Sequence, residues 1–253
     1  MRRMKNIVTA MMMSTSVLAG SGPDLDLEAM ERAKTEAEVN LKQTFSNFAF
    51  QSFEASPVEG MYQIDTGEQM IYYAPAANVL FFGEMWDADG NNLTDAALTA
   101  ATEKRMASID FASALEFGPI GAPLITEYSN PECGYCQRLH AFLEEKVEGG
   151  ARPVRRRIIF AVGHSKSAQG LAEHILCSEN PEESFSEIYE RRKPQTLLSC
   201  DEGRTRLEEH MRIAKAAGIR GTPTLTIDGE YVRGFDQARL EIFLETTSEQ
   251  GDR

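Results

Sequence analysis

The chain has 253 residues and a formal net charge of −13, and 42% of its residues are hydrophobic and 26% charged. This composition is that of a folded globular protein with room for one large domain or two modest ones, and it excludes wholesale disorder. The negative charge disfavours nucleic-acid binding, because phosphates would be repelled. The densest basic stretch, from Arg152 to Arg157, leads into an apolar run and is typical of a strand entry.

The N-terminus has the pattern of a secretory signal peptide. Basic residues at positions 2, 3 and 5 precede an apolar run from Ile7 to Leu18, which ends in small residues. The run is too short for a membrane-spanning helix, which needs about 20 residues. We therefore expect residues 1–19 to be cleaved on export to a compartment where disulfides persist. The alternative is a disordered, methionine-rich start.

Residues 20–93 are predicted to form a small α+β domain. Apolar residues three and four positions apart predict an amphipathic helix from Asp26 to about Asn47. Four short β-rich runs follow, separated by turn signals. These runs are FAFQSFEAS (48–56), GMYQIDT (60–66), QMIYYAP (69–75) and VLFFGEMWD (79–87). We expect a small antiparallel sheet with a helix beside it, and we expect Phe81, Phe82 and Trp86 in its core.

Residues 94–117 return to a helical pattern, which we interpret as a helix linking two domains. Thr94 is its predicted N-cap, and Gly118-Pro119 is a stop signal. Residues 118–253 then read as β-α-β, a helical insertion at 165–218, and β-β-α, with Asp228-Gly229 as the turn of a hairpin. This order predicts a domain of the α/β class.

Cys133-Gly134-Tyr135-Cys136 is the main chemical signal. Where such a motif opens a helix, the first cysteine lies at the helix N-terminus, whose free N–H groups and dipole stabilise its thiolate. The second cysteine is partly buried and resolves a mixed disulfide. The alternative is half of a zinc site, which would need two more ligands at a compatible spacing. The pattern favours thiol–disulfide chemistry, and we expect neither a metal nor a cofactor.

Two further features are expected near the dithiol. Glu127 interrupts an apolar strand six residues before Cys133, and a carboxylate beneath the dithiol could take the proton that Cys136 loses. An exposed strand residue is an equal alternative. Thr222-Pro223 comes at the mouth of a strand and suits a cis peptide bond, which costs little only before proline. Beside the dithiol it would leave a backbone edge free for a substrate peptide.

The other cysteines and one histidine have supporting interpretations. Cys177 and Cys200 lie in the helical insertion, and in an exported chain we expect a structural disulfide between them, contributing about 3 kcal/mol. A second redox pair is the alternative. His140 lies one turn past Cys136 and could favour the thiolate if protonated, although we prefer a packing or surface role.

These residues resemble the periplasmic DsbC/DsbG disulfide isomerases, and most closely the DsbC branch. The resemblance is specific in the run from Cys133 to His140, in Gly221-Thr222-Pro223 and in the second cysteine pair. It is weaker upstream, where PVEGMY (57–62) and VLFFG (79–83) are similar to the N-terminal dimerisation domain of that family.

The resemblance implies a dimerisation domain at 20–93, a linker helix at 94–117 and a thioredoxin-like catalytic domain at 118–253. It also implies a periplasmic, V-shaped homodimer in which Cys133 attacks wrong disulfides of misfolded exported proteins and Cys136 releases them. A membrane thiol reductase would keep the dithiol reduced. Glu127 departs from the DsbC pattern and is similar to the buried acid of thioredoxin and DsbA. The alternatives are a monomeric reductase or oxidase of the same fold, and a holdase chaperone.

Overall fold

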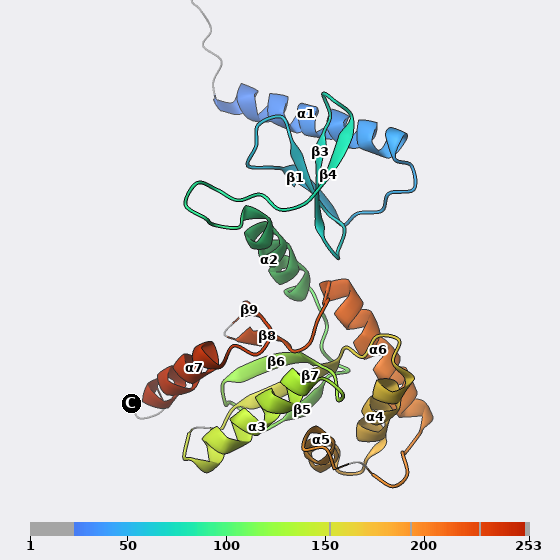
Figure 1. The fold of residues 1–253 in the computed structure, drawn as a ribbon, viewed down its shortest axis with the longest axis vertical. Coiled ribbons are helices and arrows are strands. Elements are labelled where there is room, and N and C mark those ends of the chain that lie inside the picture. Colours follow the sequence, from blue (N-terminus) through green and yellow to red (C-terminus); the bar gives the residue numbers. More distant parts are fainter. Residues whose placement is uncertain (1–22, 152, 193, 228, 251–253) are drawn as a thin grey trace, which may run out of the picture. The chain divides into compact units, whose positions relative to one another are not determined.

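The computed structural model describes residues 23–250 except Arg152, Lys193 and Asp228 (Figure 1). The expected signal peptide, residues 1–19, lies outside the described residues. The chain divides into two compact units, Met1–Asn47 and Phe48–Arg253. The first unit contains α1 (Pro23–Thr44), which corresponds to the predicted amphipathic helix. No helix within the described part of the chain is long and apolar enough to cross a membrane.

The second unit begins with a four-stranded antiparallel sheet of order β1-β2-β3-β4, as the four β-rich runs predict. Its strands are β1 (Ser52–Ala55), β2 (Tyr62–Asp65), β3 (Met70–Ala74) and β4 (Val79–Phe82). The expectation that Phe81, Phe82 and Trp86 are core residues is wrong, because these side chains are 58%, 65% and 59% exposed. The two phenylalanines lie next to each other on the edge strand β4, whose residues are mostly exposed.

The helix predicted at 94–117 is shorter in the structure. Helix α2 (Leu93–Met106) ends eleven residues early, and β5 (Leu115–Phe117) follows it. Leu115 and Phe117 are buried because β5 pairs antiparallel with another strand, and this pairing overrides the helical spacing. The N-cap is Asn92 rather than Thr94, whose hydroxyl instead lies 2.5 Å from the Tyr72 hydroxyl.

The remaining strands form a five-stranded mixed sheet of order β5-β7-β6-β8-β9. These strands are β6 (Leu124–Ser129), β7 (Arg155–Phe160), β8 (Thr224–Ile227) and β9 (Glu230–Arg233). Only the β6–β7 pair is parallel among the strand pairs of this sheet that the structure describes. Helices α3 (Gly134–Glu148) and α7 (Gln237–Gln250) share a core cluster with Ile125 of β6, whereas α2 and α6 (Asp201–Ala217) share another with Tyr128. Helices therefore cover both faces of the sheet.

The insertion is helical, as predicted. It consists of α4 (Lys166–Cys177), α5 (Pro181–Tyr189) and α6, which lie near one another and away from α7 (Figure 1). Phe185, Ile188 and Tyr189 of α5 are buried in one cluster with Cys136 of α3 and strand β7. The insertion thus forms part of the core under the dithiol, besides covering the sheet.

Candidate active site

The turn between β6 and α3 fixes the position of Cys133. Strand β6 ends at Ser129, and the Asn130 side chain accepts a hydrogen bond from the backbone of Glu132 at 2.9 Å. The Asn130 carbonyl accepts another from the Cys133 backbone at 3.0 Å. Cys133 is consequently the N-cap residue of α3, where the N–H groups of the first turn point towards its sulfur.

The two thiols of the motif differ in their surroundings. Cys133 is half-buried, whereas Cys136 is only 1% exposed. Hydrogen bonds from the Cys136 thiol, the Thr222 side chain and the first backbone N–H groups of α3 lower the pKa of Cys133 to about 5, although partial burial opposes this. Burial and the Cys133 sulfur raise the pKa of Cys136 far above its usual range. At neutral pH the pair therefore consists of one thiolate and one thiol.

Thr222-Pro223 borders the thiolate across the fold. The peptide bond between the two residues is cis, and the protonated Cys133 thiol donates a 3.1 Å hydrogen bond to the Thr222 carbonyl oxygen. The antiparallel pairing of β6 and β8 places Tyr128 opposite Thr224, which brings the start of β8 to the end of β6. This register explains how residues 89 positions apart meet at one sulfur.

The residues between the two cysteines face outward. Tyr135 is 57% exposed, and the Arg138 guanidinium stacks over its ring with its carbon 4.0 Å from the centroid. A side-chain carbon added at Gly134 would meet no atom within 4 Å, so steric crowding does not require glycine there. Tyr135 and Arg138 therefore present an apolar and cationic surface beside the thiolate.

Glu127 is buried and paired with a cation. Its side chain is 1% exposed, and its two carboxylate oxygens accept hydrogen bonds from Nε and Nη2 of Arg156 at 2.6 and 3.0 Å. The interpretation of Glu127 as an exposed strand residue is thus wrong. Both carboxylate oxygens are therefore engaged by the guanidinium of Arg156.

His140 is a buried neutral residue. Its Nδ1 lies 2.9 Å from Nη1 of Arg156, and its side chain is 1% exposed. Burial, assisted by the charge of Arg156, lowers the pKa of His140 to about 3. The ring is therefore uncharged at neutral pH, which contradicts both a surface role and the hypothesis of a protonated histidine beside the thiolate.

Two hydroxyls beneath the dithiol escaped the sequence analysis. The Ser129 and Tyr189 hydroxyl oxygens lie 2.7 Å apart, and Tyr189 is buried in one cluster with Cys136. A polar residue ending the apolar strand β6 was a weak signal for Ser129. Tyr189 had no such signal, because it lies 53 positions from Cys136 on a helix of the insertion.

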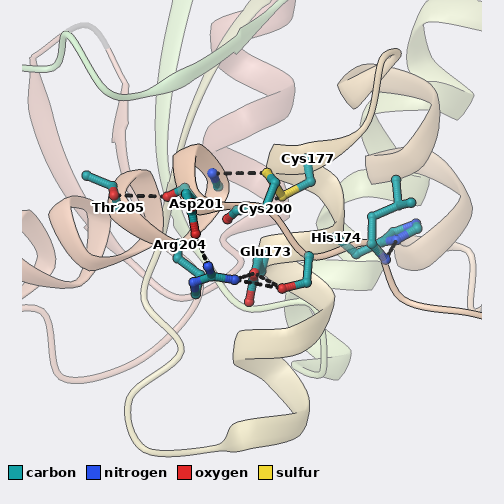
Figure 2. Close-up of a disulfide and its surroundings, with 10 residues drawn as sticks. Glu173, His174, Cys177, Cys200, Asp201, Arg204 and Thr205 are labelled. Carbon is teal, nitrogen blue, oxygen red and sulfur yellow. Dashed lines mark hydrogen bonds and ion pairs between the residues drawn. A yellow bond between two sulfur atoms is a disulfide. The ribbon is translucent and has the colours of Figure 1, made fainter.

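The second cysteine pair is a disulfide in the structure. Figure 2 shows that it joins the last residue of α4, Cys177, to Cys200 just before α6. Cys200 is the N-cap of α6, and its sulfur accepts a hydrogen bond from the Gly203 backbone at 3.2 Å. Ser199 donates a 2.6 Å hydrogen bond to Glu173, which also pairs with Arg204 (Figure 2).

Metal ligation has little support in this geometry. No group of three or more His, Cys, Asp or Glu side chains among the described residues is arranged to hold a metal ion. The dithiol itself has Ser129, Tyr189 and Thr222 as polar neighbours, and these are not the ligands of a structural zinc site.

Two protein families match the chain over complementary segments. Residues 28–95 match the N-terminal domain of disulfide bond isomerase proteins, and residues 113–247 match the thioredoxin-like domain. The chain belongs to the DsbC family of thioredoxin-fold thiol:disulfide interchange proteins. This membership agrees with the position of Cys133 at the N-terminus of α3.

Individual DsbC proteins are similar to most of the chain. The thiol:disulfide interchange protein DsbC of Salmonella typhimurium is 26% identical over 202 residues, which cover 76% of this chain and 79% of that protein. DsbC of Escherichia coli is 23% identical over 214 residues, which cover 81% and 86%. A linker-deletion mutant of Proteus mirabilis ScsC has a similar fold, with a TM-score of 0.50 and 19% identity over 62% of this chain and 86% of that structure.

Proposed function

We propose that this protein isomerises wrong disulfides in exported proteins of the periplasm. The observation that carries the proposal is the half-buried Cys133, whose pKa of about 5 makes it a thiolate at neutral pH, on a DsbC-family chain. The thiolate attacks one sulfur of a substrate disulfide and displaces the other as a thiolate. That substrate thiolate then attacks a different disulfide, and a last exchange regenerates Cys133 with no net transfer of electrons.

Cys136 acts when rearrangement stalls. It attacks the Cys133 sulfur of the mixed disulfide, and the substrate leaves in reduced form while the enzyme is oxidised. A membrane thiol reductase is then needed as a partner to return the dithiol to its reduced form. Thr222, Pro223, Gly134 and Tyr135 border the sulfur that the substrate must approach, and we assign them to substrate contact.

The remaining residues of the site support it from within the core. Glu127 neutralises Arg156, and His140 fills the space beside this pair as an uncharged ring. The Cys177–Cys200 disulfide is structural, because it holds α4 to the start of α6, away from the dithiol.

A second copy of this chain is the proposed partner at β4. An edge strand with apolar side chains on both faces is a template for pairing with another chain, and Phe81 and Phe82 are both exposed on β4. Residues 28–95 match the N-terminal domain of disulfide bond isomerases, which supports a homodimer formed through this region.

A monomeric oxidase or reductase is the second candidate, and one observation favours it. A cysteine with a pKa of about 5 is a good leaving group, which makes a Cys133–Cys136 disulfide easier to reduce and a stronger oxidant. Net oxidation would need the dithiol kept oxidised in the cell, whereas isomerisation needs it kept reduced.

Refolding of a scrambled protein with several disulfides tests these two functions. We expect the wild type to restore substrate activity, Cys136→Ala to retain part of this activity, and Cys133→Ala to abolish it. Light scattering after size exclusion should give the mass of a dimer. A monomer that only reduces or only oxidises disulfides would contradict the isomerase proposal.

A further inference from the structure

Arg138 is the first of two exposed arginines that are fixed beside the nucleophile. Its guanidinium stacks over the ring of Tyr135, two residues after Cys133, with the guanidinium carbon 4.0 Å from the ring centroid. Stacking of this kind uses the face of the guanidinium and leaves the N–H groups in its plane available. Those groups have the geometry to bind both oxygens of a carboxylate.

Arg191 is the second exposed arginine, and its contacts lead to the other side of Cys133 in the sequence. Its Nε donates a 2.9 Å hydrogen bond to Oε1 of Gln137. Nε2 of Gln137 in turn donates a 2.8 Å hydrogen bond to the carbonyl of Pro131, two residues before Cys133. The segment after α5 is thereby joined to the turn that carries the nucleophile, and the Nη groups of Arg191 form no hydrogen bond within the described part of the chain.

The backbone of Arg191 adopts a conformation that favours glycine. Its φ is +67°, in the left-handed region, and it lies two residues after the last residue of α5, Tyr189. Glycine is the usual residue at such a helix end because it has no side-chain carbon to crowd the backbone. An arginine at this position costs stability relative to glycine, which indicates that its side chain has a role of its own.

Neither arginine pairs with a carboxylate within the described part of the chain. Acidic partners are plentiful, because the chain has 39 Asp and Glu against 26 Lys and Arg, and other arginines of the domain do pair, as Arg212 does with Glu209. The acidic residue next to the nucleophile, Glu132, accepts hydrogen bonds from the hydroxyls of Ser165 and Ser167 at 3.0 and 2.6 Å instead. Two positive charges therefore stay uncompensated beside the dithiol of a negatively charged protein.

We propose that Arg138 and Arg191 select substrate disulfides that are flanked by acidic residues. This inference rests on the proposed function and names the class of substrate. The Cys133 thiolate forms a bond to one sulfur of the disulfide, and the other sulfur leaves with the electron pair, while the neighbouring carboxylates stay bound to the two guanidinium groups. The net charge of −13 repels acidic partners at long range, so the selection operates at contact distance.

Synthetic peptides that contain one cysteine in a disulfide with an uncharged thiopyridine measure this selection. Three peptides differ only in the residues that flank the cysteine, which are glutamates, glutamines or lysines. Attack of the Cys133 thiolate on the peptide sulfur forms a mixed disulfide, and the released sulfur takes up a proton to give thiopyridone. Stopped-flow absorbance of thiopyridone gives the rate constant, and the preference is the ratio of the rate constants for the glutamate and glutamine peptides.

Arg138→Gln and Arg191→Gln should each lower this ratio about two- to fivefold, which is the effect of one exposed ion pair, and the double variant should lower it further. Added salt should bring the ratio of the wild type towards that of the double variant. Alkylation by iodoacetamide, an uncharged reagent, should keep its rate at pH 7, because a Cys133 thiol with a pKa of about 5 remains ionised there.

Arg191→Gly separates the selection from stability. Glycine suits the left-handed backbone, so this variant should have a melting temperature no lower than that of the wild type, and it should still lower the ratio as Arg191→Gln does. Lys104→Gln is the matched control for charge. It removes one exposed positive charge from α2, outside the thioredoxin-like match at 113–247, and should leave the ratio unchanged.

An unchanged ratio in the double variant would overturn the inference. Equal slowing with all three peptides, or an equal loss of preference in Lys104→Gln, would overturn it too. Failure of the proposed function is a separate result. In that case the peptides would still show the preference, because it is measured at the first attack by Cys133, but scrambled substrate would not recover its activity.

Discussion

Cys133 owes its acidity to groups from two parts of the chain, the first turn of α3 and Thr222. The Cys136 thiol lies one helical turn away, Thr222 arrives through the pairing of β6 and β8, and the N–H groups belong to the start of α3. Their combined effect exceeds the cost of partial burial, which alone would favour the neutral thiol. The nucleophile is thus a property of the assembled fold more than of the four-residue motif.

The rate of alkylation of reduced Cys133 should follow its ionisation. We expect the rate with iodoacetamide to be half-maximal near pH 5 and constant above about pH 7, as followed by mass spectrometry. The folded pKa lies below that of the unfolded thiol, so the stability from the thiolate is fully present above about pH 9 and is lost as pH falls through 5. A midpoint above pH 8, the value of a free cysteine, would contradict the proposed activation.

The buried ion pair of Glu127 and Arg156 leads to a prediction about the free energy of unfolding. Arg156→Met should lower the free energy of unfolding by about 3–5 kcal/mol, because it leaves a buried carboxylate without its partner. Glu127→Leu combined with Arg156→Met should recover most of that loss. Denaturant unfolding followed by far-UV circular dichroism measures both. A loss below about 1 kcal/mol in the single variant would mean that the pair behaves like an exposed one.

At the scale of elements, the contact between the disulfide and α6 limits what residue 203 can be. A side-chain carbon at Gly203 would lie 2.3 Å from the Cys177 sulfur and 3.0 Å from the Cys200 sulfur. Gly203→Ala should therefore lower thermal stability strongly while the disulfide is present. In a Cys177→Ala, Cys200→Ala background the penalty should shrink, because the sulfurs are gone. An equal penalty in both backgrounds would show that the clash is not the cause.

The sequence predicted most elements because their apolar residues follow the helical or strand period. The prediction from the sequence was wrong where a tertiary contact overrides the helical or strand period. Residues 115–117 fit a helix by spacing, but β7 needs a partner at its edge. Phe81 and Phe82 look like core by composition, but they lie on a strand with no neighbour on one side.

The residues of the candidate active site also divide into those that the sequence predicted and those that depend on tertiary contacts. The dithiol and Thr222-Pro223 could be found because each is a local motif, and the second cysteine pair could be found because a disulfide is expected in an exported chain. Arg156 and Tyr189 could not be found in this way, because their place in the site exists only after α5 and β7 have packed against α3. Glu127 stood out in the sequence, but its partner, which determines its chemistry, did not.

At the scale of the whole molecule, the exposed edge of β4 predicts the oligomeric state. Phe81→Glu combined with Phe82→Glu should convert the dimer to a monomer, because charged side chains on an edge strand oppose pairing with another chain. The monomer should lose isomerase activity and keep dithiol reductase activity. Light scattering and the two activity assays check this.

Ile120→Glu serves as the control for the edge-strand variant. Ile120 is 94% exposed and lies before β6, outside the four-stranded sheet, so the added charge should alter neither mass nor activity. A dimer that survives in the edge-strand variant would place the interface elsewhere on the chain.

The Cys177–Cys200 bond has a consequence for how the enzyme matures. The segment between these cysteines contains α5 and therefore Tyr189, so closing this loop also secures a hydroxyl beneath the dithiol. If the proposed function holds, a new copy of this chain must itself be oxidised at one cysteine pair before it can act on other proteins. Its maturation would then require an oxidant for Cys177 and Cys200 and a reductant for Cys133 and Cys136, each acting on one pair of the same domain.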